Sequence, residues 1–277
     1  MKDVEVRIGD LAAPNGSEQT KSGRGPNGTL GAGSESQGSF KTIIAEQDEV
    51  STQTEQPFIV TIDGPAASGK SSVSREIARR LGWNWVSTGA FYRGLAYVAY
   101  KAEVDLKDEE AVVTLARSAN WFIRMTAEET CVFLNGQNVT SEVGKEEIGT
   151  LASKISSLPK VRLALLEAQR QCAKSVTGLV AEGRDCGTVV FPQAQVKVFL
   201  TARAEDRAAR RALEEGRDLS KTIDEQKRRD AQDATRKTAP MQASADSNTI
   251  DTTQLSFVEV VEKVEDLVRA KLASISN

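Results

Sequence analysis

Residues 64–71 carry the clearest chemical pattern in the sequence, because they read Gly-Pro-Ala-Ala-Ser-Gly-Lys-Ser and match G-x-x-x-x-G-K-[ST]. The glycines allow backbone N–H groups to surround phosphate groups, and the N-terminus of a following helix adds partial positive charge. In this pattern the Lys70 ammonium neutralises the β- and γ-phosphates, and the Ser71 hydroxyl can bind Mg²⁺. The sequence therefore predicts a loop that binds the phosphates of a nucleotide.

The loop also has the flanking elements that this pattern requires. Residues 57–63 form a short apolar run that is typical of a buried parallel strand. Residues 70–81 place apolar side chains at helical spacing, and Gly82 follows as a C-terminal cap. A strand, a glycine-rich loop and a helix in this order support a P-loop over a chance glycine-rich turn.

Four further clusters combine charged residues with small ones. They lie at Ser87–Arg93, at Ala152–Ser153 with Leu158–Arg162, at Glu182–Pro192 and at Arg229–Arg236. The chain lacks the NKxD pattern of guanine-specific GTPases, and its body is too small for most motors. Arginines at strand and helix ends favour phosphoryl transfer, which depends on positioning and on neutralising the equatorial phosphate oxygens.

At these clusters the chain resembles bacterial cytidylate kinase. That family reads IDGP-x-[AG]-[SA]-GK[GS], [DS]-[ST]-G-A-x-Y-R, [DE]-GRD-x-GT-VFP and RD-x-x-D-x-x-R, and the same motifs occur here in the same order. The resemblance covers about residues 57–273 and implies a kinase domain at 57–277 with the P-loop fold of nucleoside monophosphate (NMP) kinases. That α/β fold has a doubly wound parallel five-stranded sheet. A small antiparallel NMP-binding insert is expected at about 117–158 and a helical lid at about 217–240.

The resemblance also implies an activity, the transfer of the γ-phosphate of ATP to CMP or dCMP with Mg²⁺. The ATP site would comprise Gly64, Pro65, Ala66, Ala67, Ser68, Gly69, Lys70, Ser71 and Ser72, with Arg210 at the adenine and Ser71 as metal ligand. Thr88, Arg162 and Asp185 would read the cytosine, and Ser153 and Asp233 would hold the sugar. Arg93, Arg184, Arg229 and Arg236 would clamp the acceptor phosphate or the transferring group. The catalytic residues would be Lys70, Arg184, Arg229 and Arg236.

Several residues keep a second interpretation. Glu182 and Asp63 are each candidates to hold Mg²⁺ through water, and a structural role is open for both. Ser87 stands where the family often has Asp, which leaves an acidic role there in doubt. Arg207, Arg210 and Arg211 favour a solvated helix face, with adenine contact by Arg210 as the alternative. We expect Asp230 and Lys237 to be exposed to solvent and Lys70 to be half exposed.

Two other functions compete with this interpretation. The first is a related P-loop kinase that acts on another acceptor, such as a different nucleoside monophosphate or shikimate. The second is a nucleotide-binding regulator without catalytic activity. A regulator would need to have lost the acceptor clamp, but this chain retains all four clamp arginines, Arg93, Arg184, Arg229 and Arg236.

The arrangement of apolar runs predicts the elements that position these residues. Helical patterns separate the runs after residue 57, which is typical of a doubly wound α/β sheet. Further core strands are expected at 84–86, 178–182, 196–200 and 249–251. Short antiparallel strands interrupt the alternation at 121–140, where Asn135-Gly136 is a strong hairpin turn. Ser256 and Glu259 form a capping box at the start of the last helix.

The composition excludes several classes of protein. The 277 residues contain no histidine, which rules out Ser-His-Asp triads and zinc sites built on histidine. No stretch approaches 18 consecutive apolar residues, and the first residues lack the apolar core of a signal peptide. Cys131, Cys172 and Cys186 form no CxxC pair and favour a reducing compartment. We therefore expect a cytoplasmic protein without membrane partners, and a monomer.

Residues 1–56 differ from the rest of the chain. They hold five Lys and Arg against nine Asp and Glu, and they are rich in Gly, Ser, Thr, Asn and Gln. We expect a disordered N-terminal extension, because such a segment cannot bury enough apolar surface to offset the entropy of ordering. Deleting residues 1–50 should then leave activity and thermal stability nearly unchanged. The remaining residues carry a net charge of +1, which gives no basic excess for binding nucleic acid.

Overall fold

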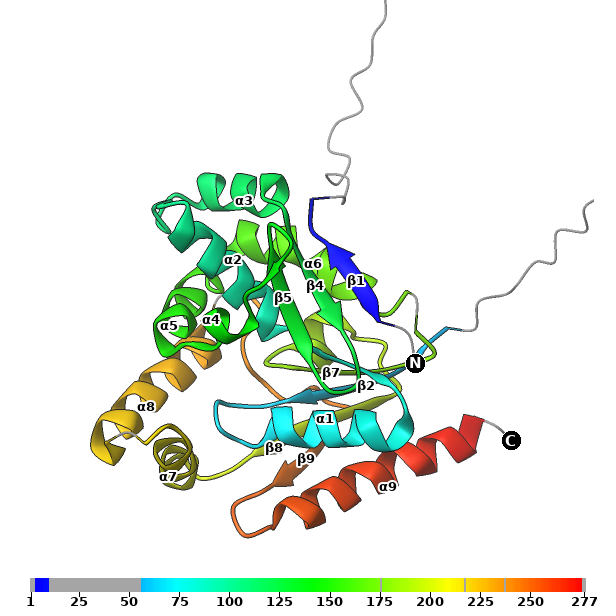
Figure 1. Cartoon of the computed structure of the whole chain (residues 1–277). Helices are drawn as coiled ribbons and strands as arrows, with labels where there is room; N and C mark the ends of the chain where they lie inside the picture. The colour runs from blue at the N-terminus through cyan, green and yellow to red at the C-terminus, as the bar shows by residue number, and fades with distance from the viewer. Residues whose placement is uncertain (1–2, 10–55, 175, 217, 237, 276–277) are drawn as a thin grey trace, which may run out of the picture. The chain divides into compact units, whose positions relative to one another are not determined.

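A five-stranded parallel sheet forms the centre of the computed structural model, which describes residues 3–9, 56–174, 176–216, 218–236 and 238–275. Its strands are β2 (Phe58–Asp63), β3 (Asn84–Ser87), β7 (Gly178–Gly183), β8 (Val196–Thr201) and β9 (Asn248–Asp251), in the spatial order β3-β7-β2-β8-β9. The predicted doubly wound α/β sheet is confirmed. Because all five strands are parallel, the loops that follow β2, β3 and β7 meet at one edge of the sheet (Figure 1).

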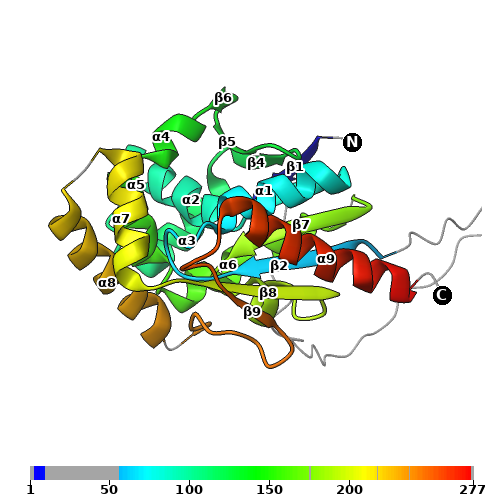
Figure 2. The ribbon, with the colours of Figure 1, turned by 90° about the horizontal axis from the view of Figure 1, so that it is seen from below.

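Helices cover both faces of this sheet. One core cluster joins β2, β7 and β8 to α1 (Lys70–Leu81) and α9 (Phe257–Ile275), which lie on the same side of the sheet (Figure 2). A second cluster joins the sheet to α2 (Gly89–Lys101), α3 (Glu109–Ser118) and α6 (Pro159–Gln171). At the start of α9, the Ser256 N–H donates to Glu259 (2.8 Å) and the Glu259 N–H donates to the Ser256 hydroxyl (3.3 Å), which confirms the capping box.

The remaining elements build the insert and the lid. They are β4 (Trp121–Met125), β5 (Thr130–Leu134), β6 (Gln137–Asn138), α4 (Thr140–Gly144), α5 (Glu146–Ile155), the one-turn π-helix Cys186–Val190, α7 (Ala204–Glu215) and α8 (Leu219–Thr235). Asn135 and Gly136 have φ of 52° and 79° and join β5 to β6 in the predicted hairpin turn. Helices α7 and α8 pack together beside α5 (Figures 1 and 2). Among the described residues, no helix combines the length and apolar character needed to cross a membrane.

The first described residues correct the expectation for the N-terminal extension. Residues 4–7 form β1 (Val4–Arg7), which pairs antiparallel with β4, so the expected disorder is wrong for residues 3–9. Deleting residues 1–50 would remove this paired strand, so we now expect the deletion to lower the thermal stability. The second sheet therefore has the order β1-β4-β5-β6. Residues 10–55, which hold the rest of the predicted extension, lie outside the described residues.

Both faces of β1 make contacts that explain its position. Val4, Val6 and Ile8 alternate along the chain and are buried in the core cluster that contains β4 and α3. On the other face, Glu5 pairs with Arg124 of β4, and Arg7 lies over a phenylalanine ring of the same strand. An apolar pattern of period two over only three residues is sufficient to form a strand here, because β4 offers an open strand edge for pairing.

Truncating Ile8, which is 1% exposed, tests whether β1 stabilises the fold. We expect Ile8→Ala to lower the free energy of unfolding by about 2 kcal/mol, because a buried isoleucine loses its packing and leaves a cavity. That loss corresponds to a fall of about 4–8 °C in Tm, measured by thermal denaturation. Glu5→Gln, which removes only a half-exposed ion pair, is the matched control and should change stability by less than about 1 kcal/mol. Equal stability of Ile8→Ala and the unaltered chain would mean that β1 does not stabilise the fold.

Candidate active site

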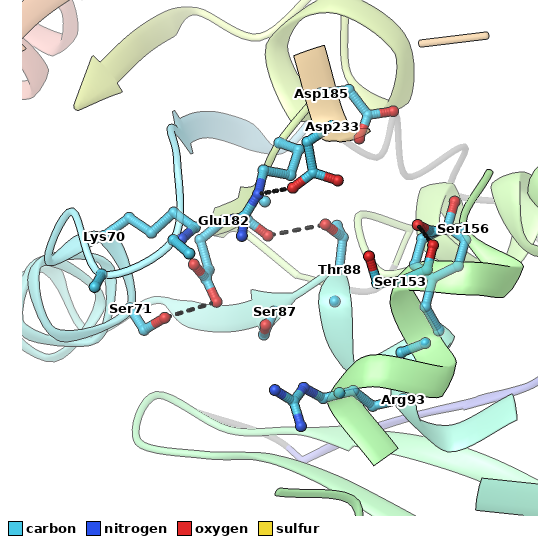
Figure 3. Close-up of a pocket in the computed structure, with 18 of the residues that line it drawn as sticks. Lys70, Ser71, Ser87, Thr88, Arg93, Ser153, Ser156, Glu182, Asp185 and Asp233 are labelled. Carbon is cyan, nitrogen blue, oxygen red and sulfur yellow. Dashed lines mark hydrogen bonds and ion pairs between the residues drawn. The ribbon is translucent and has the colours of Figure 1, made fainter. Parts of the chain in front are cut away.

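A cavity of about 300 Å³ lies at the carboxyl edge of the central sheet, where the loops after β2, β3 and β7 meet (Figure 3). The predicted site residues that line it are Ala66, Ala67, Lys70, Ser71, Thr88, Arg93, Ser153, Arg184, Asp185, Asp233 and Arg236. They come from the P-loop, from the segments that follow β3 and β7, from α5 and from α8 with the residue after it. The structure therefore brings most of the residues that the sequence proposed as donor and acceptor sites into one cavity.

The P-loop has a backbone that only its small residues allow. Gly64 has φ of 152°, and a Cβ atom there would overlap the carbonyl oxygen of Leu200 in β8. Gly69 has φ of 84° and immediately precedes α1, which begins at Lys70. Ala67 also has a positive φ, 56°, which is uncommon for a residue with a Cβ. The loop thus runs directly into a helix N-terminus, where phosphate binding is favoured.

Lys70 is buried in this structure, and the expectation of half exposure is wrong. The side chain is 8% exposed, because its ammonium turns back and donates to the carbonyl oxygen of Pro65 (3.0 Å) within the loop. Burial and, to a smaller extent, the nearby Arg184 guanidinium lower the pKa of Lys70 to about 8. A phosphate in the cavity would remove this penalty by supplying negative charge.

Two acidic residues beside the P-loop have different surroundings. The Ser71 hydroxyl donates to Oε1 of Glu182 (3.0 Å), whereas Oε2 of Glu182 is buried and accepts no hydrogen bond from any described residue (Figure 3). Asp63 accepts the backbone N–H groups of Cys186 (2.8 Å) and Gly187 (2.7 Å), one on each oxygen. Burial raises the pKa of Asp63 to about 6, and these two hydrogen bonds oppose the rise.

The loop after β3 places Thr88 and Arg93 at the cavity. The Thr88 hydroxyl donates to the backbone carbonyl of Glu182 (2.9 Å), which fixes the start of α2 against the end of β7. Arg93 projects from α2 and donates to the carbonyl oxygens of Val143 (2.8 Å) and of the two residues that follow it. Gly149 of α5 leaves the room for it, since a Cβ there would lie 2.8 Å from the Arg93 guanidinium. The sequence analysis missed Gly149, because only the fold places it against α2.

Asp185 and Arg162 form a buried ion pair on the insert side of the cavity. Arg162 also donates to the carbonyl oxygen of Ser156 (3.2 Å), and its guanidinium lies 5.5 Å from the centre of the Tyr92 ring. Burial raises the pKa of Asp185, and the Arg162 charge opposes that rise. These contacts hold the Asp185 carboxylate at the cavity wall.

The lid contributes a second group of charges. Nε of Arg184 donates to Asp233 of α8 (2.8 Å), and Nη1 of Arg236 lies 3.8 Å from the same carboxylate. Nε and Nη2 of Arg236 are buried and have no hydrogen-bond partner within the described part of the chain, and burial lowers the pKa of Arg236. Arg236 is therefore a buried cation that lines the cavity, with two donors that no described residue binds. Arg229 lies in α8, but its side chain is outside the described residues.

Helix α8 also reaches the insert directly. The Ser153 hydroxyl of α5 donates to Oε1 of Gln232 (3.2 Å), and Nε2 of Gln232 donates to the Ser153 carbonyl oxygen (2.8 Å). Ser153 thus lies where the insert and the lid meet at the cavity (Figure 3). Sequence order alone gives no sign of this contact, since α5 and α8 are far apart along the chain.

The interpretation of α7 as a solvated face is wrong for its three inner arginines. Arg207 is 6% exposed, Arg211 pairs with Glu146 of α5, and Arg210 donates to the Thr252 carbonyl oxygen (2.9 Å). Asp230 is not solvated either, because it accepts from Arg207 (2.6 Å). Lys237 lies outside the described residues. The partners of these arginines come from segments outside α7, which a pattern within one helix does not reveal.

These features together define a class of protein. A P-loop follows the central strand of a parallel sheet, and arginines from α2, from the turn after β7, from α7 and from the end of α8 line one cavity with it. This is the arrangement of a P-loop kinase for small acceptors, in which positioned cations stabilise a transferring phosphoryl group.

The family model described as Cytidylate kinase matches residues 60–270. A cytidylate kinase of Bdellovibrio bacteriovorus (strain ATCC 15356 / DSM 50701 / NCIMB 9529 / HD100) is 54% identical over 215 residues, which cover 78% of this chain and 99% of that protein. A cytidylate kinase of Azotobacter vinelandii (strain DJ / ATCC BAA-1303) is 44% identical over 223 residues, covering 78% of this chain and 97% of that protein. The chain belongs to the cytidylate kinase family. The predicted family, and the assignment of the chain as a phosphotransferase, are confirmed.

Replacing Lys70 tests the role of the P-loop ammonium. We expect Lys70→Ala to lower kcat/KM by about 10²–10³-fold, because one charge-assisted contact to a developing phosphate charge is worth about 3–4 kcal/mol. The measurement is ADP release with ATP, Mg²⁺ and CMP. Lys101→Ala, an exposed lysine at the end of α2, is the control and should retain full activity. Activity of Lys70→Ala within a few-fold of the unaltered chain would argue against this role.

Proposed function

We propose that this chain transfers the γ-phosphate of ATP to CMP or dCMP and releases ADP with CDP or dCDP. The observation that carries the proposal is the single cavity that Lys70 and Ser71 share with Arg184, Asp185 and Arg236. Donor and acceptor phosphates held there would lie close together, which removes much of the entropic barrier to transfer.

On the donor side, the P-loop would hold the ATP phosphates and Lys70 would neutralise their charge. Mg²⁺ fits the same place, because the Ser71 hydroxyl lies beside Glu182, whose second carboxylate oxygen is buried and unpaired. The ion would supply further neutralisation of the β- and γ-phosphates. Both oxygens of Asp63 already accept backbone N–H groups, which favours a structural role for Asp63 and the magnesium role for Glu182. Arg210 stays our proposed contact to the adenine.

On the acceptor side, the arginines would surround the phosphate that receives the transferred group. Arg236 supports this role best, because two of its donors are buried at the cavity, no described residue binds them, and a phosphate would satisfy them. Arg184 is held by Asp233 and would act beside it, with Arg93 and Arg229 completing the clamp. Ser153 and Asp233 would hold the sugar where the insert and the lid approach each other.

The base would be read at the wall formed by Asp185. A carboxylate only accepts hydrogen bonds, so Asp185 suits the N4 amino group of cytosine and opposes O4 of uracil. Arg162 pairs with Asp185 and would donate to N3 or O2, and Thr88 would lie at the same wall. Each mismatched buried group costs about 1–3 kcal/mol, so the site should prefer CMP over UMP by roughly 10- to 10³-fold in kcat/KM.

We also propose that the chain works as a monomer in the cytoplasm. The large apolar side chains that are exposed lie on several different helices, including α2, α6, α7 and α9. The three cysteines are unpaired and buried, which suits a reducing compartment.

A panel of acceptors tests the proposed function against its alternatives. Purified protein with ATP and Mg²⁺ is offered CMP, dCMP, UMP, AMP and shikimate in turn, and ADP release is measured. We expect CMP and dCMP to be the preferred acceptors. A preference for another acceptor would identify a related kinase, and no turnover with any acceptor would favour a nucleotide-binding regulator.

Replacing Asp185 tests how cytosine is selected. We expect Asp185→Asn to narrow the CMP-over-UMP ratio of kcat/KM, because an amide can turn its NH₂ group toward O4 of uracil. Both substrates are measured on the same variant, so a loss of stability from breaking the buried pair affects the two values alike. Asp266→Asn on the distant helix α9 is the control. An unchanged ratio would mean that Asp185 holds the fold and does not read the base.

A further inference from the structure

The carbonyl oxygen of Ala66, in the middle of the P-loop, accepts two hydrogen bonds from side chains of the lid. Nη1 of Arg207 in α7 donates to it at 3.0 Å, and Nε2 of Gln226 in α8 donates at 2.9 Å. Both donors are buried, with Arg207 6% and Gln226 2% exposed. Side chains of α7 and α8 therefore bind the backbone of the P-loop itself.

The two hydrogen bonds to the Ala66 carbonyl oxygen determine the direction of one backbone N–H group. A trans peptide is planar, so the Ala66 carbonyl oxygen and the Ala67 N–H point to opposite sides of the same peptide. Two donors on the carbonyl side hold that plane and thus turn the Ala67 N–H away from the lid contacts. Ala67 lines the cavity and has φ of 56°, a conformation that is costly for a residue with a Cβ. The lid contacts help to maintain this strained conformation.

The two donors are joined to each other through Asp230. Arg207 donates to Asp230 (2.6 Å) and to the carbonyl oxygen of Ala202 (3.0 Å), so its guanidinium bridges three segments of the chain. Gln226 and Asp230 are four residues apart and share one face of α8. Asp233, which holds Arg184, continues the same inner side of the helix. One helix face thus contacts both the P-loop and the acceptor arginines.

We infer that Arg207, Gln226 and Asp230 are positioning residues that couple the packing of the lid to the ability of the P-loop to hold ATP phosphates. The inference rests on the proposed function only in taking ATP as the donor. When α8 lies against the loop, the Ala66–Ala67 peptide has the orientation that phosphate binding needs. When α8 moves away, the carbonyl loses its donors and the strained peptide can relax, so the loop binds phosphate more weakly.

Gln226→Met tests this coupling, because methionine keeps the length and neutral charge of the side chain and removes the donor. The measurement is the calorimetric affinity of the full chain for a non-hydrolysable ATP analogue with Mg²⁺. We expect binding to weaken about three- to tenfold, the effect of losing one buried hydrogen bond. Lys227→Met, on the exposed side of the same helix, is the matched control and should bind within twofold of the unaltered chain. This measurement needs no acceptor, so a failure of the proposed function with CMP would not affect it.

Two further variants separate coupling from a merely structural role. Gln226→Glu also removes the donor but is polar, and Arg207→Lys keeps the charge beside Asp230 without the planar fork that reaches three partners. We expect both to raise KM for ATP at least threefold while KM for CMP changes less than twofold. A lower Tm with unchanged affinity for the analogue in all three variants would overturn the inference, because the contacts would then only pack the lid. Equal increases of both KM values would overturn it as well.

Discussion

The carboxylate of Asp63 ties together the two loops on which the active site depends. It ends β2, where the P-loop begins, and it accepts the N–H groups of Cys186 and Gly187 in the turn that follows β7. Strands β2 and β7 are neighbours in register, with Asp63 opposite Gly183, so the backbone ladder already brings the loops together. The carboxylate then fixes their distance. Lys70, Arg184 and Asp185 share one cavity because of this connection, and a buried acid with an elevated pKa persists there because backbone donors stabilise its charged form.

Near this connection, five cationic side chains and three carboxylates line the cavity. Lys70 and Arg236 both have pKa values lowered by burial, and no described residue binds two of the donors of Arg236. Such groups cost free energy in the empty protein and regain it when phosphates enter. Helix α8 carries part of this cost, because its contacts with Ala66 and with Arg184 hold the P-loop and the turn after β7 at once. In the function proposed above, the donor and acceptor sites therefore share one supporting helix, which suits a reaction that must exclude water once both substrates are bound.

Motif and periodicity were sufficient to predict the parts of the fold that repeat a simple rule. The P-loop and the buried core strands followed from local pattern, and most of the residues that the family resemblance proposed for the site line one cavity. Local pattern could not predict partners from distant segments. Arg207 and Asp230 looked like solvated charges because their mutual contact joins two helices, and Gly149 had no signal because its importance is the space it leaves for Arg93. Lys70 is buried through a contact with its own loop, which composition does not reveal.

Strand β1 was missed because three alternating apolar residues in a polar segment have little weight against the composition of the whole segment. The stabilising effect of β1 is nevertheless local to the small antiparallel sheet and to α4, which follows that sheet and contacts Arg93. The match to the family begins at residue 60, so β1 lies outside it. Without β1, the small sheet would consist of β4, β5 and the two-residue β6, and sheets of two full strands are only marginally stable. Pairing with β1 turns β4 into an interior strand and covers its edge. The chain runs from that sheet through β6 into α4, whose carbonyl oxygens bind Arg93. A strand that lies outside the family match thus stabilises the scaffold that holds Arg93, which we propose as part of the acceptor clamp.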